Sequence, residues 1–178
     1  MDKIEGYLEV GWKDGEVVVN HPDLKPDENG VGHIVFSPSQ ARSLATLLIK
    51  HASIAEDWTR EQQEAERLKN IPPVDRSKQC MTDGSPVTED HREIDPNTGQ
   101  QKGYVALCPA ERAKGFVRPV RRSYRHMTCN SVTSMGLALA ETYARDPGFY
   151  SGTFCCQCQK HFPLDQFVWE GTTEKVGS

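Results

Sequence analysis

Apolar and polar residues alternate near the start of the chain, and this pattern predicts a small β-sheet. Residues 7–20 place two β-rich runs, YLEVGWK and EVVVN, with Asp14-Gly15 at their junction. That dipeptide accepts the positive φ of a tight hairpin turn. A polar segment around residues 26–30 leads to a short apolar run, Ile34-Val35-Phe36. We therefore expect an N-terminal β-hairpin or short sheet.

The next segment repeats apolar residues every three or four positions, which is typical of an amphipathic helix. Ser37 can cap this helix, Pro38 suits its first position, and Gln40 lies three residues after the cap. Pro72-Pro73 ends it. A helix over 38–70 would be about 50 Å long at roughly 1.5 Å per residue. Because this is long for a small domain, we expect it to pair with a partner helix or with a second copy of the chain. The apolar stripe comprises Ala41, Leu44, Ala45, Leu48, Ala52, Ala55 and Trp58.

The pattern weakens after this helix. Residues 71–102 are rich in proline, glycine and polar side chains and indicate a linker with loops. Further on we expect a short strand at 104–107, a helix from Ser134 to Arg145 capped by Thr133 or Ser134, and a last strand at 167–169. The predicted fold class is α+β. It has an N-terminal hairpin and one long helix (1–70), the linker and loops (71–102), and a small C-terminal module (103–178).

Composition narrows the possible functions. The 178 residues are 37% hydrophobic and 26% charged, which is lean for one large core, and small units with lean cores often depend on a metal or a partner. The net charge of −4 argues against a dedicated nucleic-acid binder. No run approaches the roughly 20 apolar residues that span a bilayer, and the N-terminus lacks the apolar core of a secretory signal. We therefore expect a cytoplasmic protein with no membrane contact and with reduced cysteines.

Two ligand pairs give the strongest chemical signal. His126-Met-Thr-Cys129 and Cys155-Cys-Gln-Cys158 are separated by 25 residues, which is the usual spacing of two zinc knuckles. We predict one zinc ion bound by His126, Cys129, Cys155 and Cys158, in a treble-clef or zinc-ribbon-like module. Four protein ligands leave no open position for an activated water, as in structural zinc sites. The alternatives are Cys156 in place of Cys155, and either His161 or Cys108 as the fourth ligand.

A basic run precedes the first ligand pair. Between Glu111 and His126 six basic residues face one acidic residue, and Phe116 and Tyr124 are interleaved with them. Such a strip can contact phosphates and stack on bases, so it predicts a surface for an acidic protein or a nucleic acid. The alternative is a solvated charged face. The predicted partner-binding residues are Arg112, Lys114, Arg118, Arg121, Arg122 and Arg125.

The stretch from Asp90-His91 through Asn97-Thr-Gly99 to Gly103-Tyr-Val-Ala-Leu107-Cys108 resembles part of the phage-type recombination endonucleases of the HNH superfamily. The resemblance implies a metal-dependent nuclease in which Asp90 and His91 are catalytic. The motif order differs, because the segment Cys-x-x-Cys-x-x-His-Phe-Pro-Leu follows this stretch here and precedes it in those enzymes. The second cysteine expected after Cys108 is also missing.

A longer segment is similar to a set of uncharacterised bacterial and phage proteins. The likeness begins at Thr82 and is densest over 103–118, AETYARDPGFYSGTFC (140–155) and His161-Phe-Pro163. It implies a bacterial or phage-encoded protein, in the latter case located in the host cytoplasm, with a host-interaction or defence-related role. We therefore expect a non-enzymatic, zinc-stabilised binding protein that engages a protein or an anionic partner. The HNH-like nuclease is the alternative.

Overall fold

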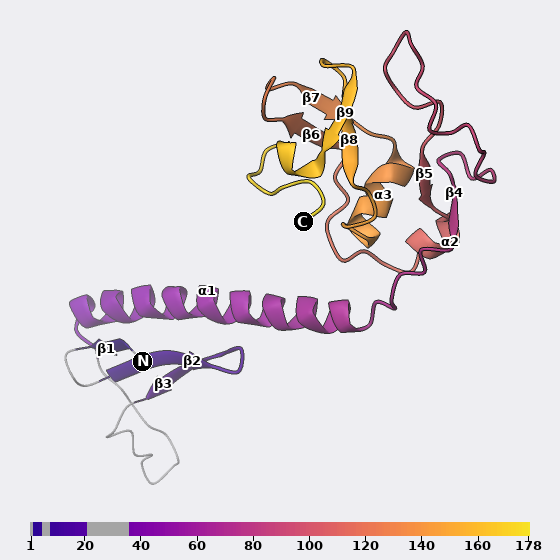
Figure 1. Ribbon diagram of the computed structural model, residues 1–178. Coiled ribbons are helices and arrows are strands. Elements are labelled where there is room, and N and C mark those ends of the chain that lie inside the picture. Colours follow the sequence, from indigo (N-terminus) through magenta and orange to yellow (C-terminus); the bar gives the residue numbers. More distant parts are fainter. Residues whose placement is uncertain (1, 5–7, 21–35) are drawn as a thin grey trace. The chain divides into compact units, whose positions relative to one another are not determined.

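The computed structural model describes residues 2–4, 8–20 and 36–178, and these form two compact units that divide between Lys69 and Asn70 (Figure 1). Together they contain small antiparallel sheets, one long helix and a cluster of cysteine and histidine side chains, which agrees with the predicted α+β class.

The first unit contains a three-stranded antiparallel sheet in the order β1 (Asp2–Ile4), β2 (Leu8–Lys13), β3 (Glu16–Asn20). The turn between β2 and β3 has φ 52° at Asp14 and 86° at Gly15, so the predicted hairpin and its turn are confirmed. A Cβ atom on Gly15 would lie 2.8 Å from Thr59 Oγ1, and the turn therefore packs closely on the long helix. The apolar run expected at 34–36 lies outside the described residues except for Phe36.

That helix is α1 (Pro38–Lys69), and it begins at the predicted capping box. The Ser37 hydroxyl accepts a hydrogen bond from the Gln40 amide at 3.2 Å, and the Gln40 side chain accepts one from the Ser37 amide at 2.9 Å. The helix packs its first half on the sheet, where Val10 is fully buried against Leu44, Leu47 and Leu48. From 61 to 69 the side chains are exposed, apart from the partly buried Leu68.

The second unit consists of three small antiparallel sheets and two helices. Two sheets are pairs, β4 with β5 and β8 with β9, and the third has the order β10-β6-β7. In chain order the elements are β4 (Gln79–Met81), β5 (Val105–Leu107), α2 (Pro109–Arg112), β6 (Ser123–His126), β7 (Val132–Ser134), α3 (Leu137–Arg145), β8 (Gly152–Cys155), β9 (Lys160–Pro163), the 3-10 turn η1 (Leu164–Gln166) and β10 (Phe167–Trp169).

Two local expectations differ from this arrangement. The helix predicted from Ser134 begins at Leu137 with Gly136 as its N-cap, because Thr133 and Ser134 pair with Tyr124 and Ser123 in the β6–β7 ladder. The predicted capping residues were therefore wrong. The segment 71–102 contains β4, which pairs with β5 through Cys80 and Ala106, and it belongs to the second compact unit. The strand expected at 167–169 is confirmed as β10.

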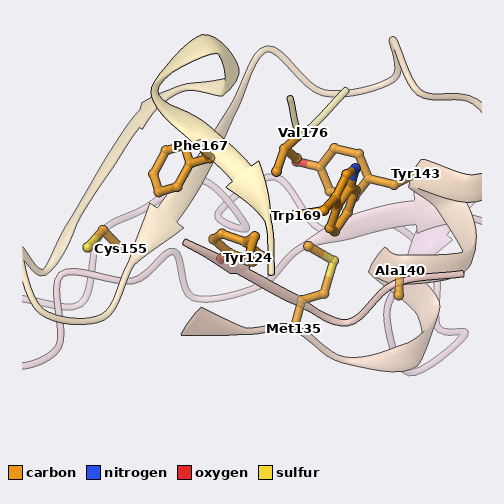
Figure 2. Close-up of a cluster of buried hydrophobic side chains, with 8 residues drawn as sticks. All are labelled: Tyr124, Met135, Ala140, Tyr143, Cys155, Phe167, Trp169 and Val176. Atoms are coloured by element: carbon orange, nitrogen blue, oxygen red, sulfur yellow. The ribbon is translucent and has the colours of Figure 1, made fainter. Parts of the chain in front are cut away.

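The core of the second unit is rich in aromatic side chains (Figure 2). Tyr124 meets Phe167 edge to face at a centroid distance of 5.5 Å, and Tyr143 meets Trp169 in the same way at 5.7 Å. These edge-to-face contacts stabilise beyond the area that they bury. Cys155 is a member of the same cluster and is fully buried, so this core borders the cysteine and histidine cluster directly.

A buried ion pair joins α2 to the end of α3. Arg145 Nη2 lies 3.1 Å from Glu111 Oε1, and the two side chains are 0% and 1% exposed. Glu111 also accepts hydrogen bonds from the Asp75 amide and from Lys114, while Arg145 donates to the Pro72 carbonyl at 2.7 Å. The pair thereby holds the segment around residues 72–75, near the start of this unit, against α2 and α3.

Candidate metal centre

The first ligand pair lies on a tight turn at the end of β6. His126 is the last residue of that strand, and its amide donates to the Ser131 carbonyl at 3.0 Å. The turn closes when the Asn130 amide donates to the His126 carbonyl at 2.8 Å, with Asn130 at φ 57°. Asparagine tolerates this left-handed conformation better than most residues.

The second ligand pair lies on a turn of the same geometry at the end of β8. The Gln159 amide donates to the Cys155 carbonyl at 2.8 Å, and Gln159 has φ 52°. In both turns the residue after the second ligand is left-handed and bonds back to the carbonyl of the first ligand. Two segments that are far apart in the sequence thus form matching knuckles, each presenting two ligand atoms on one side.

The four ligand atoms converge on one point. His126 Nδ1 lies 3.3 Å from Cys129 Sγ and 3.6 Å from Cys158 Sγ, and Cys129 Sγ lies 3.5 Å from Cys155 Sγ. All four atoms lie within 4.8 Å of one another. Metal–ligand bonds of 2.3 Å to sulfur and 2.0–2.1 Å to nitrogen give tetrahedral edges of about 3.8 Å between sulfurs and about 3.5 Å between nitrogen and sulfur. These four residues therefore form a group that is positioned to bind a metal ion.

Aromatic rings and a side-chain amide hold the His126 ring in place. It stacks on Phe162 and on Phe167, at centroid distances of 4.6 and 4.7 Å, and the residue is 1% exposed. Nε2 lies 3.4 Å from Gln166 Oε1, so the amide oxygen favours the tautomer with its proton on Nε2 and leaves Nδ1 free toward the sulfurs. Sequence reasoning missed these three supporting residues, which follow the second knuckle closely in the chain.

The thiols of the group differ in acidity. The backbone N–H of Ser131, followed by the neighbouring ligand side chains, lowers the pKa of Cys129 to about 7. Burial, followed by the two nearby cysteines Cys155 and Cys129, raises the pKa of Cys158 to about 11. Because the accumulated negative charge opposes further ionisation, a cation at the centre would be needed for all three sulfurs to be thiolates together.

The rival ligands of the sequence analysis lie outside this group. Cys156 is exposed, and its sulfur lies 3.7 Å from Ser131 Oγ and 3.5 Å from the Val132 carbonyl. His161 Nε2 is hydrogen-bonded to the Tyr104 hydroxyl at 3.0 Å. Cys108 interacts with the buried Cys80 of β4.

The residues of the nuclease alternative lie in the loops between β4 and β5. Asp90 is paired with Lys102 at 3.4 Å, and His91 Nδ1 lies 2.5 Å from the Thr88 carbonyl. Within the part of the chain that the structure describes, the knuckle residues make up the only group of three or more metal-ligating side chains, and neither Asp90 nor His91 belongs to it.

The six basic residues of the predicted partner strip all have intramolecular partners. Four of them form ion pairs: Arg112 with Glu141, Lys114 with Glu111, Arg121 with Glu174, and Arg125 with Glu170. The other two donate hydrogen bonds to main-chain oxygens. These are Arg118, bonded to Ser178 at 3.1 Å, and Arg122, bonded to Met135 at 3.2 Å.

Comparisons with protein-family models, with curated proteins and with solved structures find no match for this chain. Among the helices of the described residues, none has the length and apolar character required to cross a bilayer. The function must therefore be argued from the arrangement of the chain's own residues.

Proposed function

We propose that this protein is a non-enzymatic binding protein whose C-terminal unit is held together by a structural zinc ion in a knuckle-type module. The convergence of one imidazole nitrogen and three sulfurs within 4.8 Å carries this proposal. A tetrahedral set of sulfur and nitrogen ligands suits Zn²⁺ better than the octahedral, oxygen-preferring cations.

The completeness of the ligand set supports a structural role over a catalytic one. All four positions of a tetrahedral ion would be taken by protein atoms, so no position remains for a water that could be activated. His126 and Cys155 are buried, whereas Cys129 and Cys158 are partly exposed, so the full set of four protein ligands is what would keep a substrate from the ion. Asp90 and His91 lie outside this group, so the structure gives them no metal-binding partners among the described residues.

The proposed ion would add a direct link between two hairpins that also share the aromatic core and the hydrogen bond from Tyr124 to the Phe154 carbonyl. One ligand pair follows strand β6 and the other follows strand β8, and these strands belong to different sheets. Cys155 extends from the second knuckle into the aromatic core. Binding of the ion would thus fix the position of both sheets around that core, and in small modules such binding energy is largely folding energy.

We assign partner binding to the two arginines of the strip that are exposed and donate hydrogen bonds to main-chain oxygens. An acidic protein or another anionic partner can approach Arg118 and Arg122 from solvent. The exposed second half of α1 is a candidate surface for a protein partner or a second copy of the chain.

The decisive experiment is elemental analysis of the purified chain. We expect one zinc per chain, and we expect a chelator to abolish the near-ultraviolet circular dichroism of the aromatic core. A metal-free chain with an intact aromatic signal would contradict the proposal. For the partner surface, the Arg118→Ala/Arg122→Ala variant should elute from an anionic matrix at lower salt than the Lys78→Ala/Lys160→Ala variant, which loses the same charge elsewhere in the unit.

A further inference from the structure

The second unit contains two adjoining cavities that neither the metal group nor the basic strip uses. The first, called here the aromatic pocket, has a volume of about 290 Å³. The second, called the basic hollow, has a volume of about 390 Å³ and is more open. They meet at Tyr150 and Gly152, which line both.

No charged residue lines the aromatic pocket. Its wall carries five aromatic rings: Tyr104, Tyr124, Tyr143, Tyr150 and Phe154. Three of the tyrosine hydroxyls are bound to the protein itself, to His161, to the Phe154 carbonyl at 2.7 Å and to the Val105 carbonyl at 2.8 Å. What these tyrosines offer to a ligand is therefore their aromatic surface, which favours a flat, uncharged ring.

Two polar side chains at the same pocket remain available to such a ring. Among the described residues, no hydrogen-bond partner is recorded for the Gln100 amide or the Thr82 hydroxyl, and both residues are exposed. An amide can donate and accept at once, which suits the edge of a heterocycle. The volume lies at the small end of ligand sites and matches a single planar ring system better than a large ligand.

The basic hollow has the opposite character. It is lined by Arg76, His91 and Arg92 and by no acidic residue. Arg76 is held in place by Asp146, at 2.6 and 2.8 Å, whereas Arg92 has no recorded ion pair or hydrogen bond with any described residue. The Thr88 carbonyl faces His91 Nδ1, which places a proton there and leaves Nε2 for a ligand. A free guanidinium beside these groups suits a phosphate, which it can bind with two hydrogen bonds.

We propose that the two cavities together form a binding site for a nucleotide, with the base in the aromatic pocket and the phosphate in the basic hollow. The two cavities share Tyr150 and Gly152 in their lining, so a base and its phosphate, which are joined through one sugar, would occupy the two cavities across these residues. Gly152 itself packs on β9, where an added Cβ atom would lie 2.7 Å from the Phe162 carbonyl oxygen. The site goes beyond the proposed structural role of the metal and does not depend on which ion is bound.

The test is calorimetric titration of the full chain with the four ribonucleoside 5′-monophosphates and, separately, with the matching nucleosides. We expect at least one monophosphate to bind about tenfold more tightly than its nucleoside, since the phosphate contact is charge-assisted. Arg92→Ala should remove this difference and leave nucleoside binding unchanged. Lys160→Ala, which removes an exposed charge away from both cavities, should bind as the parent does.

A second variant tests the aromatic pocket, where the base is proposed to bind. Gly136 lines the aromatic pocket, has φ −64°, and would place a Cβ atom with no heavy atom within 4 Å, so Gly136→Leu adds bulk at the wall without backbone strain. It should weaken monophosphate and nucleoside alike by about tenfold or more. A 5′-phosphorylated oligonucleotide that competes for the site would identify a strand end as the source of the nucleotide.

Three results would overturn the proposal: no saturation by any monophosphate at about 10 mM, equal affinity for nucleosides and monophosphates, or an Arg92→Ala variant that binds like the parent. Circular dichroism and zinc content, measured on the same samples, distinguish a folded variant that does not bind nucleotide from a variant that does not fold. A folded, metal-loaded chain without nucleotide affinity refutes this site and leaves the proposed zinc role intact.

Discussion

Replacement of Cys158 by serine tests the role of the metal group most directly. Cys158 Sγ lies 3.6 Å from His126 Nδ1 and supplies one of the four converging ligand atoms. Serine keeps the size of the side chain but does not supply a thiolate at neutral pH. If the metal affinity falls about a thousandfold, the free energy of unfolding falls by about 4 kcal/mol when the ion is present at a fixed concentration. In a unit of roughly 100 residues this lowers the melting temperature by about 15–30 °C.

The adjacent cysteine offers a matched control. Cys156 lies two residues before Cys158, is exposed, and lies outside the group of ligands. Cys156→Ser should therefore change the stability by less than about 0.5 kcal/mol, as most surface substitutions do. Cys158→His should recover part of the loss, because an imidazole can serve as a zinc ligand.

Differential scanning calorimetry of the full chain, with elemental analysis of the same samples, gives the answer. We expect the transition of the C-terminal unit to move down in Cys158→Ser and to stay in place in Cys156→Ser. If Cys158→Ser melts within a few degrees of the parent and still carries one zinc per chain, the assignment of this thiolate as a ligand is refuted.

Four further predictions rest on other contacts of the same unit. Replacement of Glu111 by alanine leaves the buried Arg145 charge without its partner and should cost about 3–5 kcal/mol in thermal or denaturant unfolding. Hydrogen bonds to Lys114 and the backbone lower the folded pKa of Glu111 from 4.5 to about 2. The stabilisation that Glu111 provides is therefore present above pH 4.5 and is lost as the pH falls toward 2. An acid titration followed by circular dichroism measures this loss. Gly99→Ala should destabilise the protein more than Gly84→Ala, although both glycines have positive φ. Only at Gly99 would the added Cβ atom clash with a carbonyl oxygen, that of Gln159 at the second knuckle. Equal melting temperatures of the two variants would contradict this. Tyr124→Phe removes a buried hydrogen bond of 2.7 Å and should cost about 0.5–1.5 kcal/mol by the same melting assay.

Local signals in the sequence were sufficient for several features of this protein. The hairpin turn at Asp14-Gly15 and the start of α1 at Ser37 depend on residues within four positions of one another, and both were predicted. The ligand spacing also acts locally, since each knuckle is closed by a bond between residues four apart. The sequence alone therefore indicates the ligand residues, whereas their convergence depends on the packing of two sheets.

Long-range pairing explains what could not be predicted. Strand β4 lies in a segment rich in proline and glycine and is stabilised by β5, which begins more than twenty residues later. The start of α3 was misplaced because Thr133 and Ser134, both good capping residues, are used by the β6–β7 ladder. Lys114 pairs with Glu111 only three residues away, but Arg125 and Arg121 pair with Glu170 and Glu174, which lie 45 and 53 residues away and outside any local pattern.

Strand β8 connects the features on which both proposals depend. Its last two residues are Phe154, whose ring lines the aromatic pocket, and Cys155, which is both a core residue and a member of the metal group. The Phe154 carbonyl also receives the hydroxyl of Tyr124, which packs against Phe167, and Phe167 in turn covers the His126 ring. A change at the metal would therefore reach the pocket through covalently adjacent residues. If both proposals hold, the ion would act on the nucleotide site through this connection, as the anchor that keeps the pocket wall in place.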